Sequence, residues 1–517
     1  MKKPRILVVN CFSDNHRGAR GNPLFVPQPM IAAVLAGIVQ REKAEVRAWC
    51  EFSQGPLEDL RLLGWPDLLV LTGLNAAFDR MKQVAAYART LNPQVVVAMG
   101  GSAARALPLL SRRYFDYVCT GDVEQLVDVL DDTFGAGLAA ERPLPRYDLT
   151  KWLGWISFAE SSRNCNFRCN FCSMTAEDRD HVAYDLDYVR RQIEAMGYRH
   201  CVMFLDQNFF AGSRSFLRAR LELLRQLRRE GRFGGWSALV TSDFYTDPEN
   251  LRLARESGCI GFFCGVESFS RDQIAAYKKK QNLILPQEQM IAGSIEAGLV
   301  FHYGMMFDPT DRSVDDLQEE IDFIAGNPKI TLPSFLSFAI PLIGTPLFAD
   351  RLTEGSLLPD LKLRDMDGRS IVCHTRDPLD KVVDFARRMD GGLMPRRKVA
   401  AHAWNFYRRY RGRMSFLGMG SAMVDAWAMA FPALGTNGRD RRVVDASTCR
   451  SYVASTEKAG SLYRPKIRVA DRYRANFAPL FVTDADGGLA EDVIDDLAPR
   501  LVRARPAADS LFEGAAQ

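Results

Sequence analysis

The chain has 517 residues, too many for one ordinary hydrophobic core, so we expect two or three domains. Hydrophobic residues make up 47% and charged residues 25%, as is usual for globular proteins that fold in water. With 67 Lys and Arg against 63 Asp and Glu, the net charge of +4 neither indicates nor excludes an anionic partner.

The N-terminal run MKKPRILVVNCF predicts a first strand, because Asp14 and His16 follow where a signal peptide would need small residues. No stretch approaches the ~20 apolar residues of a membrane span, and residues 423–434 are interrupted by Asp425 and Pro432. Eleven scattered cysteines do not indicate a disulfide framework. We therefore expect a cytoplasmic protein without a membrane span.

Short apolar runs alternate with helical patterns over the first part of the chain. Helices are predicted near residues 29–40 and 80–91. Strands are predicted at residues 5–10, 45–50, 67–72, 94–99 and 116–119. Continuous apolar strands such as LLVL predict a Rossmann-like parallel sheet covered on both faces, with ligands at the carboxyl ends of the strands.

A glycine- and proline-containing linker at residues 135–146 precedes a second βα series. Its strands are predicted near residues 155–160, 200–205, 236–241, 260–266, 299–306 and 334–340. Six βα units are fewer than the eight of a complete barrel, so we predict an open (βα)6 barrel in an α/β protein. The predicted divisions are residues 1–136, a linker at 137–153, the barrel at 154–350 and a mostly helical C-terminal region at 351–517.

Three cysteines stand close together in the run NCNFRCNFC, as Cys165, Cys169 and Cys172. Thiolates select zinc, copper(I) and iron-sulfur centres, and a site with three protein ligands keeps one position open for chemistry. A structural zinc site would show a second pair of Cys or His at short spacing, and the next candidate, His181, lies in an unrelated run. The alternatives are such a zinc site and three ordinary buried cysteines.

The C-x3-C-x2-C spacing, with Phe171 just before the last cysteine, resembles the signature of the radical S-adenosylmethionine (SAM) enzymes. The resemblance implies that the three thiolates hold a catalytic 4Fe-4S cluster whose fourth iron binds the amino and carboxylate groups of SAM. It also implies that Phe171 packs against the adenine of SAM.

Glycines follow three strands of the predicted first sheet. Taken singly they are explained as turn residues between strand and helix. Together, and upstream of a radical SAM triplet, they resemble the cobalamin-binding domain that precedes many such enzymes. The residues that the resemblance assigns to cobalamin are Thr72, Leu74, Gly100, Gly101, Gly121 and Glu124.

The first loop departs from the cobalamin pattern. Domains that bind cobalt through a histidine carry D-x-H-x-x-G, whereas this chain reads DNHRGA, with the glycine one place early. A single correctly placed residue without its motif is weak support, so we do not assign His16 as a cobalt ligand.

Carboxylates end two strands of the predicted barrel, where barrel chemistry gathers. Asp206 lies in FLDQNFF, an F-x-D-x-x-F pattern typical of the cobalamin-dependent branch, and Glu267 and Ser268 lie in CGVESFS. By resemblance, Glu267 hydrogen-bonds the ribose of SAM, and Asp206 and Ser268 also contact the cofactor. The alternatives for the carboxylates are helix caps and surface charges.

The strand at residues 299–306 carries His302, Tyr303, Met305 and Met306, which are candidates for lining a substrate pocket. Methionines more often fill the core. PLIGTP at residues 341–346 resembles the turn that ends the barrel in this branch. Residues 403–413, AWNFYRRYRGR, are basic and aromatic, but the balanced charge favours a solvated amphipathic helix over a nucleic-acid surface.

The resemblance predicts a cobalamin-dependent radical SAM methyltransferase that methylates an unactivated carbon, or phosphinate phosphorus, of a small biosynthetic intermediate such as a secondary metabolite. Its expected partners are that substrate and an electron donor such as flavodoxin or ferredoxin, and no nucleic acid. Three alternatives stay open: a non-methylating cyclase, rearrangement or oxidation enzyme, a cobalamin or iron-sulfur sensor, and an N-terminal sheet that has lost cobalamin.

Overall fold

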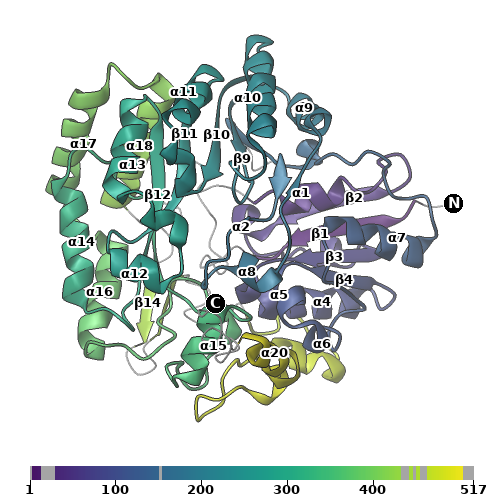
Figure 1. The fold of residues 1–517 in the computed structure, drawn as a ribbon. Helices are drawn as coiled ribbons and strands as arrows, with labels where there is room; N and C mark the ends of the chain where they lie inside the picture. The colour runs from purple at the N-terminus through teal and green to yellow at the C-terminus, as the bar shows by residue number, and fades with distance from the viewer. Residues whose placement is uncertain are drawn as a thin grey trace, which may run out of the picture.

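Two parallel β-sheets form the centre of the computed structural model (Figure 1). The structure describes residues 3–12, 29–150, 154–431, 442–445, 450–453 and 463–504. Both sheets are surrounded by helices, as the predicted α/β class requires. Within the described residues, no helix has both the length and the apolar character that a bilayer crossing needs.

The first sheet has five parallel strands in the order β2-β1-β3-β4-β5. The strands are β1 (Arg5–Asn10), β2 (Glu45–Cys50), β3 (Leu68–Thr72), β4 (Val96–Gly100) and β5 (Tyr117–Cys119). Alternate residues of β1 enter two different cores, as the period of two requires: Leu7 and Val9 pack toward α4 (Phe78–Leu91), whereas Ile6 and Val8 pack toward α1 (Ile31–Ala36) and α7 (Leu126–Phe134). Both faces are therefore buried, as predicted.

The second sheet has six parallel strands in the order β13-β12-β11-β10-β9-β6. The strands are β6 (Ile156–Ala159), β9 (Arg199–Phe204), β10 (Phe233–Val240), β11 (Cys259–Glu267), β12 (Val300–Phe307) and β13 (Phe335–Phe338). β6 and β13 lie at opposite edges and do not pair, so the predicted open barrel is confirmed.

The helices outside the barrel begin at residues that satisfy their free N–H groups. Ser213 caps α10 (Arg214–Arg229), and Asp247 with the following proline caps α11 (Pro248–Glu256). Ser313 and Asp316 form a capping box at α14 (Val314–Gly326). The remaining helices of this layer are α9 (Leu186–Ala195), α12 (Arg271–Ala276) and α13 (Gln287–Glu296). The caps of α10, α11 and α14 fix where these helices begin, and they thereby hold the loops at the carboxyl edge of the barrel in place.

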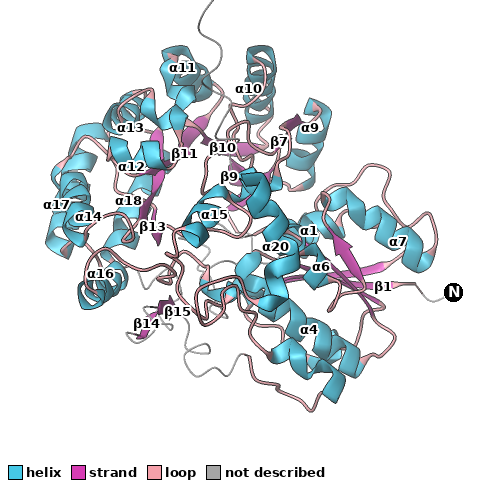
Figure 2. Cartoon of the chain, turned by 60° about the horizontal axis from the view of Figure 1, so that its bottom comes forward, coloured by secondary structure: helices cyan, strands magenta, loops and turns pink. Residues whose placement is uncertain are grey.

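The C-terminal region divides between the two sheets. Helices α16 (Leu379–Gly391), α17 (Arg396–Tyr410) and α18 (Phe416–Ala430) join the barrel core. In contrast, residues 357–373 and 463–497 share a core with α4 of the first sheet, and α20 (Glu491–Ala504) lies against α6 (Pro108–Ser111), as Figure 2 shows.

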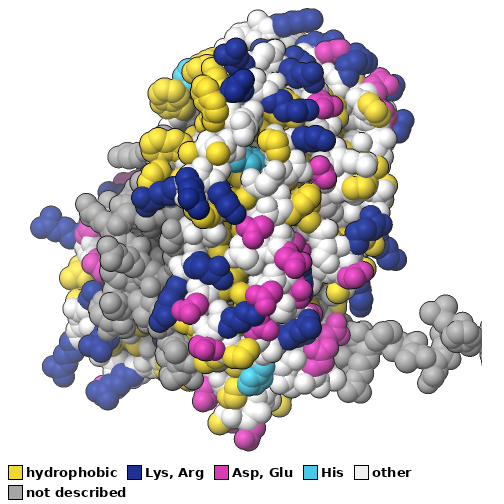
Figure 3. All heavy atoms as spheres, turned by 90° about the vertical axis from the view of Figure 1, so that its left-hand side faces the viewer, with side chains coloured by type: hydrophobic (Ala, Val, Ile, Leu, Met, Phe, Trp, Pro, Cys, Tyr) yellow, Lys and Arg dark blue, Asp and Glu magenta, His cyan; other side chains and the backbone are white. Residues whose placement is uncertain are grey.

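The basic and aromatic run at residues 403–413 falls mostly within α17. Val399, His402, Phe406 and Tyr410 make its buried stripe, and the arginines of its last turn are exposed. Among the described residues on this face of the molecule, acidic and basic side chains are intermixed (Figure 3). The predicted amphipathic helix is confirmed.

Candidate active site

The three cysteines lie on one loop at the carboxyl edge of the barrel. The chain leaves β6, forms the short hairpin strand β7 (Ser162–Arg163), which pairs with β8 (Val182–Ala183), and passes through the cysteines between these two strands. Cys172 is the N-cap position of the short helix α8 (Ser173–Glu177). All three cysteines are free thiols. The loop after the first barrel strand is where the resemblance predicts a cluster site.

Distant segments hold this loop in place. The backbone N–H of Asn170 donates to the carbonyl oxygen of Tyr277, and the carbonyl of Asn170 accepts from Leu347 N–H at 3.1 Å. From the loop after β9, the Asn208 side chain donates to Asn166 Oδ1 at 2.8 Å. The loop is therefore anchored to the ends of several barrel units, which gives three thiols a fixed orientation.

Three thiols on one loop are the kind of donor set that an iron-sulfur cluster uses. Within the described residues, no three His, Cys, Asp or Glu side chains are grouped closely enough to hold one ion. A 4Fe-4S cluster binds each thiolate through a different iron, so its ligands need not converge on one point. Burial raises the pKa of Cys172 to about 11, and a bound metal would replace the thiol proton. The donor set fits the cluster.

Glu267 and Lys279 form a buried ion pair beside this loop. Glu267 ends β11 at a bulge and has a positive φ of 64°, and its Oε1 lies 2.5 Å from Lys279 Nζ. The ammonium also donates to the Gly265 carbonyl and lies 5.9 Å from the Phe171 ring centroid. Burial alone would lower the pKa of Lys279, but the Glu267 carboxylate raises it overall. A fixed cation therefore stands next to the cysteine loop.

Sequence reasoning did not identify Lys279 or its neighbour Gln281. The run KKK at residues 278–280 has the composition of a solvated surface, yet Lys279 is 7% exposed. Gln281 Nε2 lies 3.4 Å from Cys169 Sγ. The alternation of exposure along this run is set by the turn after α12, and no local signal predicts it.

Asp206 is already engaged by groups of the protein. Its side chain is fully buried, and its carboxylate accepts hydrogen bonds from Ser161 N–H at 2.8 Å and from Ser162 Oγ at 2.7 Å. It also pairs with the buried Arg220, whose pKa is lowered to about 10 by burial. These contacts tie the start of the cysteine loop to α10, and they favour a positioning role for Asp206 over direct contact with SAM.

Ser268 is turned toward the outer helix layer. Its hydroxyl donates to Glu320 of α14 at 2.6 Å, and the residue is fully buried. Among the candidate pocket residues of β12, Tyr303 and Met305 are fully buried core residues. His302 faces α18 instead, where Asp425 Oδ2 lies 2.6 Å from its Nδ1. Residues of β12 thus have two kinds of contact: Tyr303 and Met305 pack in the core, and His302 contacts the C-terminal region.

The carboxyl edge of the first sheet brings the glycine loops together. Thr72 ends β3 and Gly100 ends β4, and the two residues pair in register. Gly101 has a φ of +103°, and a Cβ there would lie 2.7 Å from the Gly73 carbonyl oxygen. Gly121 N–H donates to Gln125 Oε1 at 2.7 Å. The presence of glycine at positions 101 and 121 is therefore explained by local structure. Gly100 is different, because a Cβ there would meet only ordinary contacts at 3.6 Å.

The edge of the first sheet faces the cysteine loop through ion pairs. Glu124, in the loop after β5, lies 2.9 Å from Arg163 of β7. From α5 (Ser102–Ala106), Arg105 lies 2.8 Å from Glu177 of α8. These pairs bring the two predicted cofactor regions next to each other. No short sequence motif predicts them. His16 of the first loop lies outside the described residues.

Comparison with known proteins agrees with this geometry. Residues 160–321 match the Radical SAM superfamily, a span that includes the cysteines, Glu267 and Lys279. The chain contains a radical SAM domain. The predicted resemblance to the radical SAM enzymes is confirmed, and the domain implies a 4Fe-4S cluster and SAM.

Two relatives carry methyltransferase names, which supports a radical SAM methyltransferase family. An uncharacterized methyltransferase of Pyrococcus horikoshii is 23% identical over 369 residues, covering 64% of this chain and 77% of that protein. The bacteriochlorophyllide d C-8(2)-methyltransferase of Chlorobaculum tepidum is 22% identical over 326 residues, covering 56% of this chain and 69% of that protein.

Among solved structures, coproporphyrinogen III oxidase from Escherichia coli, described as a radical SAM enzyme, matches with 15% identity and a TM-score of 0.26. The match covers 35% of this chain and 43% of that chain. A score this low supports no conclusion, and the open parallel barrel rests on the strand pairing described above.

Proposed function

We propose that this protein is a cobalamin-dependent radical SAM methyltransferase that methylates an unactivated carbon, or phosphinate phosphorus, of a small biosynthetic intermediate. The observation that carries the proposal is the juxtaposition of the cysteine loop with the glycine-bearing edge of the first sheet. A methyl donor and a radical generator must both reach one substrate, and this arrangement suits that requirement.

The need for radical chemistry follows from the substrate class. A carbon without an acidic proton cannot be made nucleophilic by a side chain whose pKa lies within the range that proteins can reach. A cluster with SAM supplies a 5'-deoxyadenosyl radical, and cobalamin supplies the methyl group. The protein then contributes binding, orientation and the exclusion of water.

At the barrel edge, we assign Cys165, Cys169 and Cys172 to the cluster. Lys279 supplies a fixed ammonium beside them, which suits the carboxylate of SAM, and Glu267 holds this ammonium in place. Glu267 is also our candidate for the ribose hydroxyls, and Phe171, beside Lys279, is our candidate for the adenine.

At the first sheet, we assign cobalamin to the loops after β3, β4 and β5. Leu74 is 46% exposed at this edge, and Thr72 and Gly100 end neighbouring strands. The assigned residues are Thr72, Leu74, Gly100, Gly101, Gly121 and Glu124. The assignment of cobalamin to these loops depends on their position, since local structure already explains the glycines at positions 101 and 121.

The name of the Chlorobaculum relative, a carbon methyltransferase for a bacteriochlorophyllide, makes a tetrapyrrole or similar intermediate a reasonable first substrate to try.

An anaerobic assay tests the proposal. The cluster is reconstituted, hydroxocobalamin is titrated, and the protein is incubated with a reductant, methyl-labelled SAM and extract of the source cells. We expect both 5'-deoxyadenosine and a labelled product. SAM cleavage without transfer of label would indicate a rearrangement or oxidation instead, and no 5'-deoxyadenosine under any condition would refute the radical reaction.

A further inference from the structure

Helix α18 carries an apolar stripe on the side that faces away from the barrel. Positions 416, 420, 424, 427 and 431 follow the helical spacing of three and four, so they share one face. Along this stripe Phe416 is 92%, Val424 36%, Trp427 59% and Phe431 37% exposed. The opposite face, which includes Asp425, is buried. Single apolar side chains are common on protein surfaces, but a continuous stripe of large ones marks an interaction site.

Helix α17 extends this surface with aromatic side chains. Trp404 is 59% exposed, and its ring stacks with that of Tyr407, with centroids 6.1 Å apart and an interplanar angle of 26°. The turn at residues 411–415 joins the two helices, which pack against each other. At their other end, the Arg396 guanidinium lies 4.6 Å from the ring centroid of Phe431. We call the exposed side chains of residues 396–431 the α17–α18 surface.

The α17–α18 surface is rich in basic residues and has no exposed carboxylate. Its one acidic residue, Asp425, is buried and pairs with His302. The basic residues, all exposed, are Arg396, Arg397, Lys398, Arg408, Arg409, Arg411 and Arg413. Lys398 pairs with Asp322 at 3.4 Å, and no other has a carboxylate partner in the part of the chain that the structure describes. Since the whole chain has a net charge of only +4, this positive charge is a local property of the surface.

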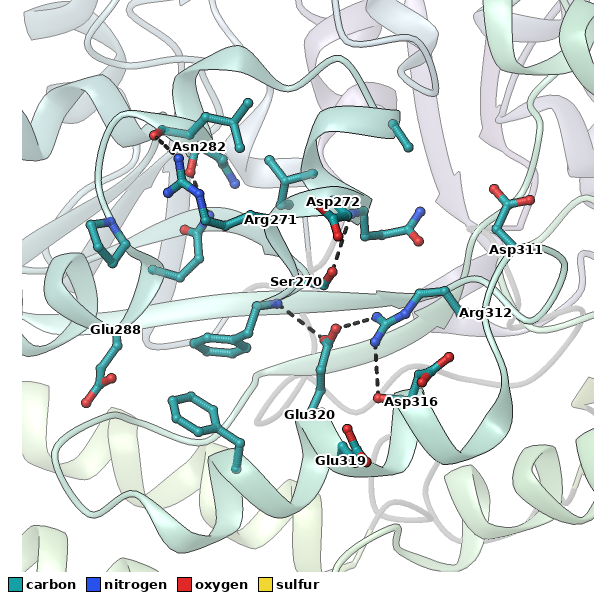
Figure 4. Close-up of a pocket in the computed structure, with 18 of the residues that line it drawn as sticks. Ser270, Arg271, Asp272, Asn282, Glu288, Asp311, Arg312, Asp316, Glu319 and Glu320 are labelled. Carbon is teal, nitrogen blue, oxygen red and sulfur yellow. Dashed lines mark hydrogen bonds and ion pairs between the residues drawn. The ribbon is translucent and has the colours of Figure 1, made fainter.

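Many acidic side chains of the barrel lie around the cavity between α12 and α14 (Figure 4). The six carboxylates that line this cavity belong to Asp272, Glu288, Asp311, Asp316, Glu319 and Glu320. None of the lining residues belongs to α17 or α18. In the upper left part of Figure 3, by contrast, hydrophobic and basic side chains lie together. Negative charge on this side of the barrel is therefore concentrated outside the α17–α18 surface.

A lipid surface fits this combination better than the other partners of a basic and apolar surface. In a symmetric dimer the same surface lies on both sides of the interface, so the arginines of one copy would meet those of the other. A nucleic acid would pair its phosphates with the arginines but would leave the apolar stripe of α18 without a partner. A bilayer meets both needs, because headgroup phosphates pair with arginines while large apolar side chains enter the boundary with the acyl chains.

We propose that the α17–α18 surface docks on a membrane whose leaflet carries anionic lipids. Both helices lie in the plane of the interface and do not cross the bilayer. Phe416 and Trp427 enter the boundary between headgroups and acyl chains. Arg397, Arg408 and Arg411, which share one face of the chain with Trp404 at helical spacing, contact the lipid phosphates. This proposal is independent of the methyl-transfer reaction.

Co-sedimentation of the full chain with lipid vesicles tests the proposal. Vesicles of phosphatidylcholine alone are compared with vesicles that contain about 30 mol% phosphatidylglycerol, a source of negative surface charge. We expect at least about 10-fold tighter binding to the anionic vesicles, and weaker binding as the salt concentration rises. No binding to the anionic vesicles, or equal binding to both kinds, would overturn the proposal.

A first pair of variants tests the apolar stripe. The double change Phe416→Ser and Trp427→Ser alters only exposed side chains, so the midpoint of thermal unfolding should be kept, and we expect at least about 10-fold weaker binding to anionic vesicles. The matched control is Leu60→Ser with Leu109→Ser, on α3 (Leu60–Leu63) and α6 beside the first sheet, where both leucines are exposed. The control should bind like the unaltered protein. Unchanged binding in the first variant, or an equal loss in the control, would refute the assignment to α18.

A second pair of variants tests the charges. Arg397→Gln with Arg408→Gln should weaken binding to anionic vesicles at least about 5-fold. Arg61→Gln with Arg112→Gln gives the same net charge, but its exposed arginines lie on α3 and at the end of α6, so binding should be nearly unchanged. Equal weakening in both would show that net charge, and not this surface, attracts the lipid.

Sedimentation velocity without lipid tests the rival occupant. A dimer of the unaltered chain that Phe416→Ser with Trp427→Ser dissociates would show that the surface binds a second copy, and it would overturn the proposal. We expect the same sedimentation coefficient for both proteins. Since these measurements need neither cluster nor SAM, they stand or fall separately from the proposed function.

Discussion

The two sheets present their carboxyl edges to one another, but their motif residues have different uses within the fold. At the barrel edge, the cysteines form no disulfide, and Lys279 is buried beside them, paired with the carboxylate of Glu267. At the edge of the first sheet, Gly101 and Gly121 serve loop contacts that any tight packing of these loops would need. Residues without a local structural use are the stronger sign of chemistry.

The largest expected effect is at the barrel edge. Cys169→Ala should reduce SAM cleavage more than about 100-fold, because even supporting groups around a metal centre are worth about 10–100-fold. Hydroxocobalamin binding should be kept. Cys201→Ala, which removes a buried thiol of β9 instead, is the matched control and should cleave SAM at nearly the normal rate. Release of 5'-deoxyadenosine and a cobalamin titration measure the two properties. Loss of both in Cys169→Ala would show that the edges do not act independently.

The second-largest expected effect follows from replacing Lys279, the buried cation beside the cysteine loop. Lys279→Met should raise the dissociation constant of SAM roughly 10–100-fold, as expected for a charge-assisted hydrogen bond of about 1.5–3 kcal/mol. It should also lower the free energy of unfolding by about 3 kcal/mol, since Glu267 is left buried and unpaired. Adding Glu267→Gln should restore part of the stability but not the affinity.

Lys280→Met is the matched control for this change, because Lys280 is an exposed neighbour in the same run. Binding is followed by equilibrium dialysis with labelled SAM, and stability by urea unfolding. An equal loss of affinity in both single variants would mean that general charge, and not the buried position, attracts SAM.

A smaller effect separates structure from binding at the first sheet. Gly101→Ala should lower the free energy of unfolding by more than about 1 kcal/mol, because its φ is positive and the added Cβ meets the Gly73 carbonyl. Gly100→Ala should leave stability nearly unchanged, since its Cβ would meet only ordinary contacts. If this edge binds cobalamin, Gly100→Ala should weaken hydroxocobalamin binding all the same. Unaltered binding by the stable Gly100 variant would argue against cobalamin at this loop.

The smallest expected effect is a pH dependence of the contact between the barrel and α18. Burial lowers the pKa of His302, but the adjacent Asp425 carboxylate raises it above its ordinary value of 6.5. The ion pair is therefore fully present below about pH 6.5, and its stabilisation of the fold is lost as the pH rises through the raised pKa.

His302→Gln tests this sign. The stability difference between the two proteins should be on the order of 1–2 kcal/mol at pH 6 and should shrink at alkaline pH. Urea unfolding at several pH values measures it. A difference that grows with pH would contradict the assigned direction. His402→Gln, whose histidine has a pKa lowered by burial, is a control on α17 with the opposite sign.

Much of the fold could be predicted because the strands are local apolar runs. The prediction for residues 260–266 became β11 at Cys259–Glu267, and the prediction for 116–119 became β5 at Tyr117–Cys119. The predicted linker behaves differently: Leu138 accepts a hydrogen bond from Gln40 N–H, and Arg146 N–H donates to the Ala33 carbonyl, so it packs against α1 and the residues that follow it. A linker made mostly of glycine, alanine and proline carries no periodic signal for such a contact.

The sequence by itself determined the two parallel sheets, their order along the chain and the loop with three cysteines, because hydrophobic period and motif spacing are local properties. Only the tertiary structure decided that Lys279 is buried, that Asp206 binds Arg220, and that residues 463–497 complete the core of the first sheet. Each of these depends on contacts between segments far apart in the chain. Burial, and not residue type, decides which charge is desolvated and available for chemistry.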